Sequence, residues 1–222
     1  MSTDVTIAGE VARTARDLAA RGLVEGTAGN VSARDAEHIA ITPTGAPLAE
    51  VQEDDIVIVD ASGDVVSGRF APTSELALHL ALYRRYDCGA VVHTHAPAAT
   101  AVACAMDELP LIHYEQLLLG GAVRIAPFVA FGTDELADAA ADAIEGRTAA
   151  LLANHGTIAH GPDLAGAARA TELLEWLSAL YLRAAAVGQP RTLTPEQAQS
   201  VIASATRRDY GRRQTLEPQE QS

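Results

Sequence analysis

Two histidines separated by a single residue could hold a metal ion beside a strand. His93 and His95 continue the apolar residues 90–92, and side chains two apart in a strand project from the same face. A His-x-His pair alone is common in ordinary strands, so the interpretation depends on a third imidazole. His155 follows another apolar segment, residues 149–153, and a catalytic zinc commonly takes three protein ligands. The sequence therefore predicts a three-histidine metal site.

Glu75 places a carboxylate near the predicted start of a helix. Thr73 and Ser74 precede it and either could cap a helix that continues through Leu76 and Leu80. Unpaired N–H groups at a helix N-terminus favour anions, so this position suits a phosphate as well as an ionised carboxylate. Taken alone, a first-turn glutamate more often only stabilises the helix dipole.

The chain contains no lysine, because all 16 of its basic residues are arginine. A chain without lysine cannot form a Schiff base with a carbonyl compound, so a metal ion would have to serve as the electron sink for any carbanion. The formal net charge of -13 also disfavours a nucleic-acid partner, because binding to a phosphate backbone needs clustered basic residues.

Helices and strands are expected to alternate along the 222 residues, as in an α/β fold of one domain over residues 1–222, with a mobile C-terminal tail from about residue 206. Helices are predicted over residues 4–21, from 73 or 74 to 83, and over 97–105, 133–144, 164–187 and 194–205; strands are predicted over 31–34, 38–42, 56–60, 65–66, 90–95 and 149–153. No apolar run approaches the ~20 residues that span a bilayer and no signal peptide is evident. We therefore expect a soluble cytoplasmic protein without a membrane partner.

Seven short motifs, taken together and in order, resemble the metal-dependent fuculose-phosphate aldolase branch of the class II aldolase and adducin superfamily. The likeness extends from Gly22 to about Gly211. It implies a three-layer α/β/α single domain around a mixed, largely antiparallel sheet, and a homotetramer with active sites at subunit interfaces. The motifs are Gly26-Thr27-Ala28-Gly29-Asn30-Val31-Ser32, Ile41-Thr42-Pro43-Thr44-Gly45, Thr73-Ser74-Glu75, Val91-Val92-His93-Thr94-His95, His113-Tyr114, Phe131-Gly132-Thr133 and Asn154-His155-Gly156.

The resemblance also implies a role for individual residues. His93, His95 and His155 would hold one Zn2+ per subunit, with Glu75 as fourth ligand and catalytic acid or base; Co2+ or Mn2+ would also suit these ligands. Six further residues would line a phosphate pocket built from hydroxyls, an amide and backbone N–H groups: Thr27, Asn30, Thr44, Gly45, Thr73 and Ser74. Thr73 departs from the serine usual in these aldolases but keeps the hydroxyl.

Two tyrosines complete the implied site. Tyr114, contributed across a subunit boundary, would give a proton to the aldehyde oxygen, and Tyr210 in the C-terminal segment would be a further catalytic residue. For His79 and His113, which lie near Glu75 and Tyr114 in the sequence, we expect supporting or packing roles.

The function implied is reversible cleavage of a ketose 1-phosphate such as L-fuculose 1-phosphate to dihydroxyacetone phosphate and a short aldehyde. L-ribulose-5-phosphate 4-epimerase and methylthioribulose-1-phosphate dehydratase are related alternatives, although the epimerase typically carries aspartate where this chain has Glu75. A non-enzymatic module like the adducin head is disfavoured because all three histidines and Glu75 are present.

Overall fold

A nine-stranded sheet forms the centre of the molecule. The structure is a computed structural model that describes residues 6–35 and 37–208. The strands are arranged in the order β4-β3-β2-β1-β5-β9-β8-β7-β6, and all neighbouring pairs are antiparallel except β7 and β8, which are parallel. The predicted mixed, largely antiparallel sheet is thereby confirmed. The strands are β1 Asn30–Asp35, β2 His38–Ile41, β3 Val57–Asp60, β4 Val65–Ser67, β5 Ala90–Thr94, β6 Glu108–Leu109, β7 Val123–Ala126, β8 Ala149–Leu152 and β9 Gly156–Gly161.

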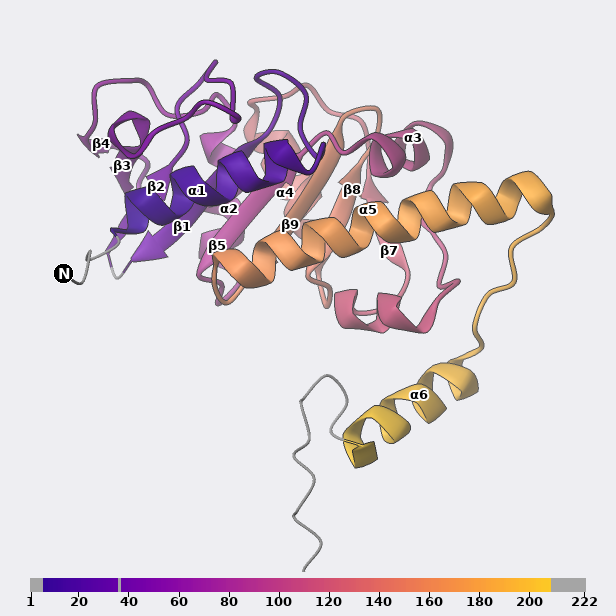
Figure 1. Ribbon diagram of the computed structural model, residues 1–222. Helices are drawn as coiled ribbons and strands as arrows, with labels where there is room; N and C mark the ends of the chain where they lie inside the picture. The colour runs from indigo at the N-terminus through magenta and orange to yellow at the C-terminus, as the bar shows by residue number, and fades with distance from the viewer. Residues whose placement is uncertain (1–5, 36, 209–222) are drawn as a thin grey trace, which may run out of the picture.

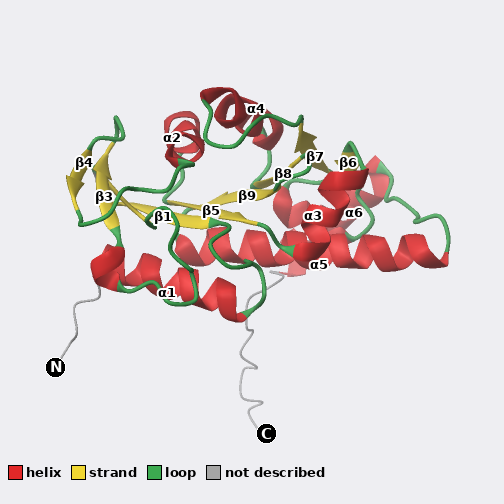
Figure 2. Ribbon diagram, turned by 90° about the horizontal axis from the view of Figure 1, so that it is seen from above, coloured by secondary structure: helices red, strands yellow, loops and turns green. Residues whose placement is uncertain are grey.

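Helices cover both faces of this sheet, which gives the expected three layers. Figure 2 shows α2 and α4 on one face and α1, α3 and α5 on the other. Each face has its own hydrophobic core, because strand residues alternate between the two sides. The helices are α1 Ile7–Ala20, α2 Leu76–Arg85, α3 Pro97–Ala105, α4 Asp134–Ile144, α5 Leu164–Val187 and α6 Pro195–Arg208, with 3-10 segments η1 Glu53–Asp55 and η2 Tyr114–Leu119.

Every residue of β5 is buried, since the strand lies between β1 and β9 in the middle of the sheet (Figure 1). Its register places His93 opposite Asn30 on one side and opposite Ile158 on the other. The predicted strand over 90–95 is thus one residue longer than β5, and His95 lies just beyond its end.

The helix after Glu75 starts later than the sequence suggests. Neither Thr73 nor Ser74 is the N-cap; Glu75 occupies that position without a capping side-chain bond, and α2 begins at Leu76. A turn precedes it, closed by a hydrogen bond from Leu76 N to Thr73 O of 3.2 Å. The hydroxyl of Thr73 instead accepts the N–H of Glu75 at 3.3 Å.

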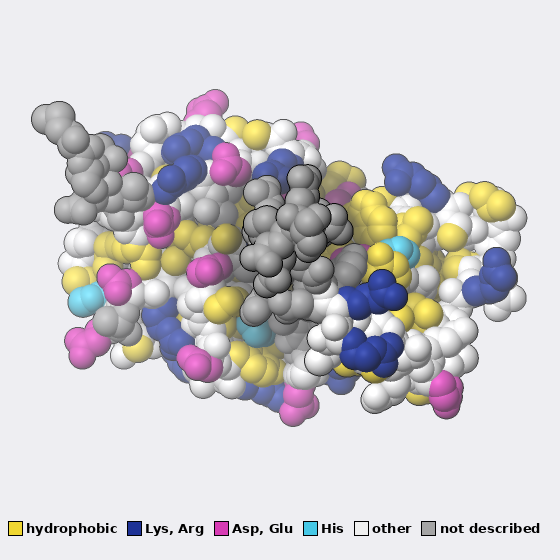
Figure 3. Space-filling model, turned by 60° about the horizontal axis from the view of Figure 1, so that its bottom comes forward, with side chains coloured by type: hydrophobic (Ala, Val, Ile, Leu, Met, Phe, Trp, Pro, Cys, Tyr) yellow, Lys and Arg dark blue, Asp and Glu magenta, His cyan; other side chains and the backbone are white. Residues whose placement is uncertain are grey.

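At the C-terminal end, α6 extends away from the layered body (Figure 1). Its described side chains include no buried residue, and it contacts η2. Figure 3 views this side of the molecule and shows hydrophobic side chains at the surface; exposed ones on η2, α5 and α6 include Leu118, Trp176 and Ile202. Among the described residues no helix is both long enough and apolar enough to cross a bilayer.

Candidate metal and substrate site

The three predicted histidines converge on one point. His93 comes from β5, His95 from the residue after that strand, and His155 from the turn that joins β8 to β9. The ring centroids are 4.9 Å apart in all three pairs, and one ligand nitrogen from each ring lies within 4.8 Å of the others. Because β5 and β9 are paired neighbours, the sheet itself brings the two sequence-distant segments together.

Hydrogen bonding fixes which nitrogen of His93 faces the cluster. Its Nδ1 lies 2.7 Å from the backbone oxygen of Thr157, and a carbonyl can only accept, so Nδ1 carries the proton. Its other ring nitrogen, Nε2, faces the cluster and lies 3.0 Å from His95 Nε2. A histidine ligand typically donates its second N–H to a carbonyl in this way. Thr157 was not among the predicted site residues, because a backbone acceptor leaves no mark on residue type.

Glu75 adds a carboxylate to the same point. Its Oε2 lies 3.0 Å from His93 Nε2, and its Oε1 lies 3.3 Å from His155 Nε2. Oε1 is buried and has no hydrogen-bond partner in the part of the chain that the structure describes. An orphaned carboxylate oxygen among imidazole nitrogens fits a divalent cation, because buried charges are normally paired or coordinate metals.

The electrostatics of the cluster favour the forms that bind a metal. Burial lowers the pKa of His95 to about 4, with the charges of His93 and His155 adding to the effect, and burial likewise lowers the pKa of His155. Burial opposes ionisation of Glu75, but hydrogen bonds and positive charge from His93, with Asn30 and His155 assisting, outweigh it and hold its pKa below the usual value. Neutral rings at His95 and His155 and an ionised Glu75 carboxylate are therefore expected at neutral pH.

The turn that carries His155 has an unusual backbone. Asn154 is the only non-glycine residue with positive φ, at 55°, within the described residues. Asparagine tolerates this left-handed conformation better than most residues. At the next position but one, a Cβ on Gly156 would lie only 2.4 Å from the backbone oxygen of Thr94. Glycine thus allows the β8–β9 turn to pass close to β5, next to His95.

A cleft of about 540 Å³ opens beside this cluster. Glu75, His95 and His155 line it, and Asn154 does so as well. All six residues predicted to bind phosphate line the same cleft: Thr27, Asn30, Thr44, Gly45, Thr73 and Ser74. The structure therefore joins the polar loop residues to the histidine cluster, although nothing in their sequence spacing required it.

Two aromatic residues at this cleft were not predicted as site residues. Phe128 and Phe131 both line it and are exposed, and they lie in the segment between β7 and α4. Phe131 opens the Phe131-Gly132-Thr133 motif, so a signal was present, whereas Phe128 carried none.

Tyr114 does not line the cleft beside the histidine cluster in this chain. Tyr114 begins η2 and lines a separate hollow with residues of α6, such as Val201 and Ala205. His113 precedes it, stacks on its ring and contacts Trp176 edge-on. Tyr210 lies outside the described residues.

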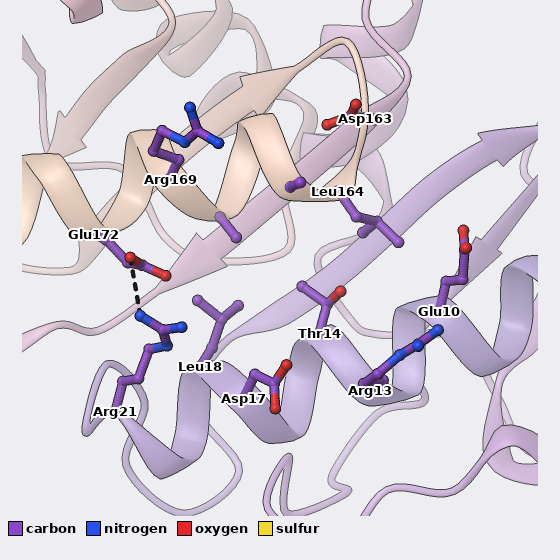
Figure 4. Close-up of a pocket in the computed structure, with 12 residues that line it drawn as sticks. Glu10, Arg13, Thr14, Asp17, Leu18, Arg21, Asp163, Leu164, Arg169 and Glu172 are labelled. Carbon is purple, nitrogen blue, oxygen red and sulfur yellow. Dashed lines mark ion pairs between the residues drawn. The ribbon is translucent and has the colours of Figure 1, made fainter. Parts of the chain in front are cut away.

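A second hollow, of about 590 Å³, lies between α1 and the start of α5 (Figure 4). Arginine and acidic side chains alternate in its lining, and Arg21 pairs with Glu172 at 3.1 Å. No histidine lines it, so the histidine cluster and this hollow are separate features.

Comparisons with known proteins agree with this geometry. The family model described as the Class II Aldolase and Adducin N-terminal domain matches residues 9–182. A 5-deoxy-D-ribulose 1-phosphate aldolase of Bacillus thuringiensis is 37% identical over 195 residues, covering 86% of this chain and 92% of the relative. An L-fuculose phosphate aldolase of Escherichia coli is 37% identical over 198 residues, covering 88% and 92%.

A solved structure of an L-fuculose 1-phosphate aldolase superposes on this chain with a TM-score of 0.86 and 38% identity, covering 93% of this chain and 98% of that one. The predicted resemblance and the predicted fold are both confirmed by these matches. The chain therefore belongs to the class II aldolase and adducin family.

Proposed function

We propose that this chain is a zinc-dependent aldolase that reversibly cleaves a ketose 1-phosphate to dihydroxyacetone phosphate and a short aldehyde. One observation carries the proposal: three imidazoles and the Glu75 carboxylate meet beside a cleft that Thr27, Thr44 and Thr73 line. The cation site can take a carbonyl, and the hydroxyls and loop amides can take a phosphate without any basic residue.

In this proposal His93, His95, His155 and Glu75 hold the metal ion. A bound divalent cation would act as a Lewis acid that polarises the carbonyl of the sugar phosphate. Zinc suits three neutral imidazoles and a carboxylate, and cobalt or manganese would also be accepted. The cleft residues Thr27, Asn30, Thr44, Gly45, Thr73 and Ser74 would hold the phosphate and so orient the chain of the substrate.

Glu75 is the group placed to move the carbon-bound proton. In the direction of synthesis its carboxylate removes a proton from C3 of dihydroxyacetone phosphate, and the electron pair released forms the new bond to the aldehyde carbon. A proton must then reach the aldehyde oxygen. Tyr114 of a neighbouring subunit in a homotetramer is our candidate donor, with Tyr210 as a further catalytic residue.

The names of two relatives supply candidate substrates for this chain. One relative is named for 5-deoxy-D-ribulose 1-phosphate and another for L-fuculose phosphate. Both sugars end in a methyl group, and Phe128 and Phe131 offer apolar surface at the cleft for such an end. Cleavage between C3 and C4 would release acetaldehyde from the first and lactaldehyde from the second, with dihydroxyacetone phosphate common to both.

The test is release of dihydroxyacetone phosphate from each sugar phosphate by the purified protein, before and after chelation and zinc return. Chelator-sensitive release that zinc restores supports the proposal. Metal-bound protein that releases none, but converts ribulose 5-phosphate to its epimer or dehydrates methylthioribulose 1-phosphate, would replace it with the corresponding alternative. Protein that binds no metal would indicate an interaction module.

A further inference from the structure

Hydrogen bonds connect five buried side chains in a line that starts at Tyr83 on α2 and ends at Glu75. Tyr83 OH lies 2.8 Å from Ser32 Oγ, and that oxygen lies 2.7 Å from His79 Nδ1. His79 Nε2 lies 2.5 Å from Asn30 Oδ1, and Asn30 Nδ2 lies 3.0 Å from Glu75 Oε2. His79 and Ser32 are 0% exposed, so bulk water does not reach these contacts.

With Glu75 ionised, each hydrogen bond in this line has only one possible donor. An ionised Glu75 oxygen can only accept, so the Asn30 NH2 group donates to it and Asn30 Oδ1 faces His79. A carbonyl oxygen also only accepts, so His79 Nε2 carries the proton. The neutral ring then accepts at Nδ1 from the Ser32 hydroxyl, and Ser32 Oγ accepts from the Tyr83 hydroxyl.

We propose that His79 is a positioning residue that fixes the orientation of the Asn30 amide, and through it the Glu75 carboxylate. If the amide turned by half a rotation, its oxygen would face Glu75 Oε2, and two acceptors would then oppose each other at about 3 Å. The Nε2–H of His79 opposes this rotation, because it would then meet the NH2 group. The consequence for turnover rests on the proposed role of Glu75 as acid or base.

A packing role alone does not account for a histidine here. His79 lies between Leu78 and Leu80 on α2, and both leucines are buried. An imidazole costs more to bury than an aliphatic side chain unless both nitrogens are hydrogen-bonded. Both nitrogens of His79 are bonded, and one of them bonds a residue that contacts Glu75.

A first experiment tests which atom donates each hydrogen bond in this line, and it does not depend on enzyme activity. Nitrogen NMR on the full-length, zinc-loaded protein with isotope-labelled histidine reports which ring nitrogen of His79 carries the proton; His79→Gln identifies its signals by their loss. We expect a proton on Nε2 and none on Nδ1. A proton on Nδ1 would overturn the proposal, whether or not the protein cleaves a sugar phosphate.

A second experiment tests coupling to catalysis by a double-mutant cycle. His79→Leu is expected to lower kcat by roughly tenfold or more, whereas His79→Gln, whose amide nitrogen can replace Nε2–H, should stay within about threefold of wild type. In an Asn30→Ala background, His79→Leu should change kcat by less than about twofold, because the residue through which it acts is gone. Fully additive losses, or equal losses in the glutamine and leucine variants, would overturn the proposal.

Leu80→Ala provides the matched stability control on the same helix. It should lower Tm while leaving kcat per folded molecule unchanged, which separates loss of packing from loss of orientation. An inactive wild-type protein would count against the proposed aldolase function, whereas the NMR result would still decide the orientation of Asn30.

Discussion

Asn30 and His93 lie directly opposite each other on the antiparallel strands β1 and β5. Glu75 Oε2 contacts both, at 3.0 Å from Asn30 Nδ2 and 3.0 Å from His93 Nε2. A shift of one residue in this register would turn one of the two side chains to the other face of the sheet. The pairing of two strands that are distant in sequence therefore determines whether a carboxylate, an amide and an imidazole can meet.

Glu75→Gln should separate metal binding from catalysis. The amide keeps the shape of the side chain but cannot act as a base, so kcat should fall by about 10²–10⁴-fold. Metal content should stay close to that of wild type, because the three histidines remain. Steady-state cleavage assays with metal analysis of the same samples provide the measurement, and full activity in this variant would exclude Glu75 as the acid or base.

His155→Ala should lose both metal and activity. Only two imidazoles of the cluster would remain, and the Glu75 Oε1 atom would lose the nitrogen that lies 3.3 Å away. His160→Ala is a suitable control, since His160 stacks on Tyr86 and hydrogen-bonds Arg147 O rather than joining the cluster. Metal analysis after dialysis should show loss in the first variant alone; equal retention in both would refute the ligand assignment.

Much of the fold follows from local periodicity, whereas the site does not. The spacing of apolar residues predicted α3 and α5 with the bounds that the structure shows. It missed β9, because Gly156–Gly161 begins and ends with glycine and includes His160, so it lacks a clear strand pattern. It also missed β7 and the short β6, whose pairing arises from tertiary contact.

The chemistry of the site was predictable only where residue type carries it. His93 and His95 could be chosen from their two-residue spacing on a predicted strand, with His155 as a third imidazole after another apolar segment. The six polar cleft residues were predicted from the resemblance of the motifs. The contact between Asn30 and Glu75 depends on a register that no local pattern encodes. The expected single domain over residues 1–222 and the homotetramer stay predictions.

Gly156→Ala should weaken both the fold and the metal site. The added Cβ would lie 2.4 Å from Thr94 O and 2.9 Å from a ring carbon of His95, so β5 and β9 would have to separate locally. Overpacking of this kind costs about 1–3 kcal/mol. Gly188→Ala is the control, because a Cβ there meets no atom within 4 Å. Thermal unfolding and zinc titration should show changes in the first variant only, and a wild-type Tm for both would contradict the close approach.

Glu175→Gln should destabilise the start of α3. The Glu175 carboxylate, from α5, accepts the N–H groups of Ala98 and Ala99 at 2.9 and 2.8 Å, at the helix that begins two residues after His95. Loss of the charge at a helix N-terminus is expected to cost about 0.5–2 kcal/mol.

The matched control is Glu172→Gln on the same helix. Glu172 pairs with Arg21 at the surface, and such pairs contribute about 0–1 kcal/mol. Urea unfolding of the two variants should therefore rank Glu175→Gln as the less stable. The reverse order would show that the cap contributes little.

Acid should destabilise the protein partly through His79. Burial lowers the pKa of His79 from 6.5 to about 3; the charge of His93 adds to this effect and that of Glu75 opposes it. At pH values between about 3 and 6.5, His79 binds a proton in the unfolded chain but not in the folded chain. Stability contributed by the neutral ring is therefore complete above the unfolded pKa and is lost as pH falls toward about 3.

His79→Gln isolates this contribution, because the lowered pKa values of His95 and His155 remain in both proteins. With chelator present, the free energy of unfolding of wild type should fall more steeply with decreasing pH, by up to about 1.4 kcal/mol per pH unit for the one extra proton. Urea unfolding at several pH values below about 6.5 gives the slope of the unfolding free energy against pH for wild type and for His79→Gln. Identical slopes would mean that the folded protein protonates His79 as readily as the unfolded chain does, and that its ring is not held neutral between Ser32 and Asn30.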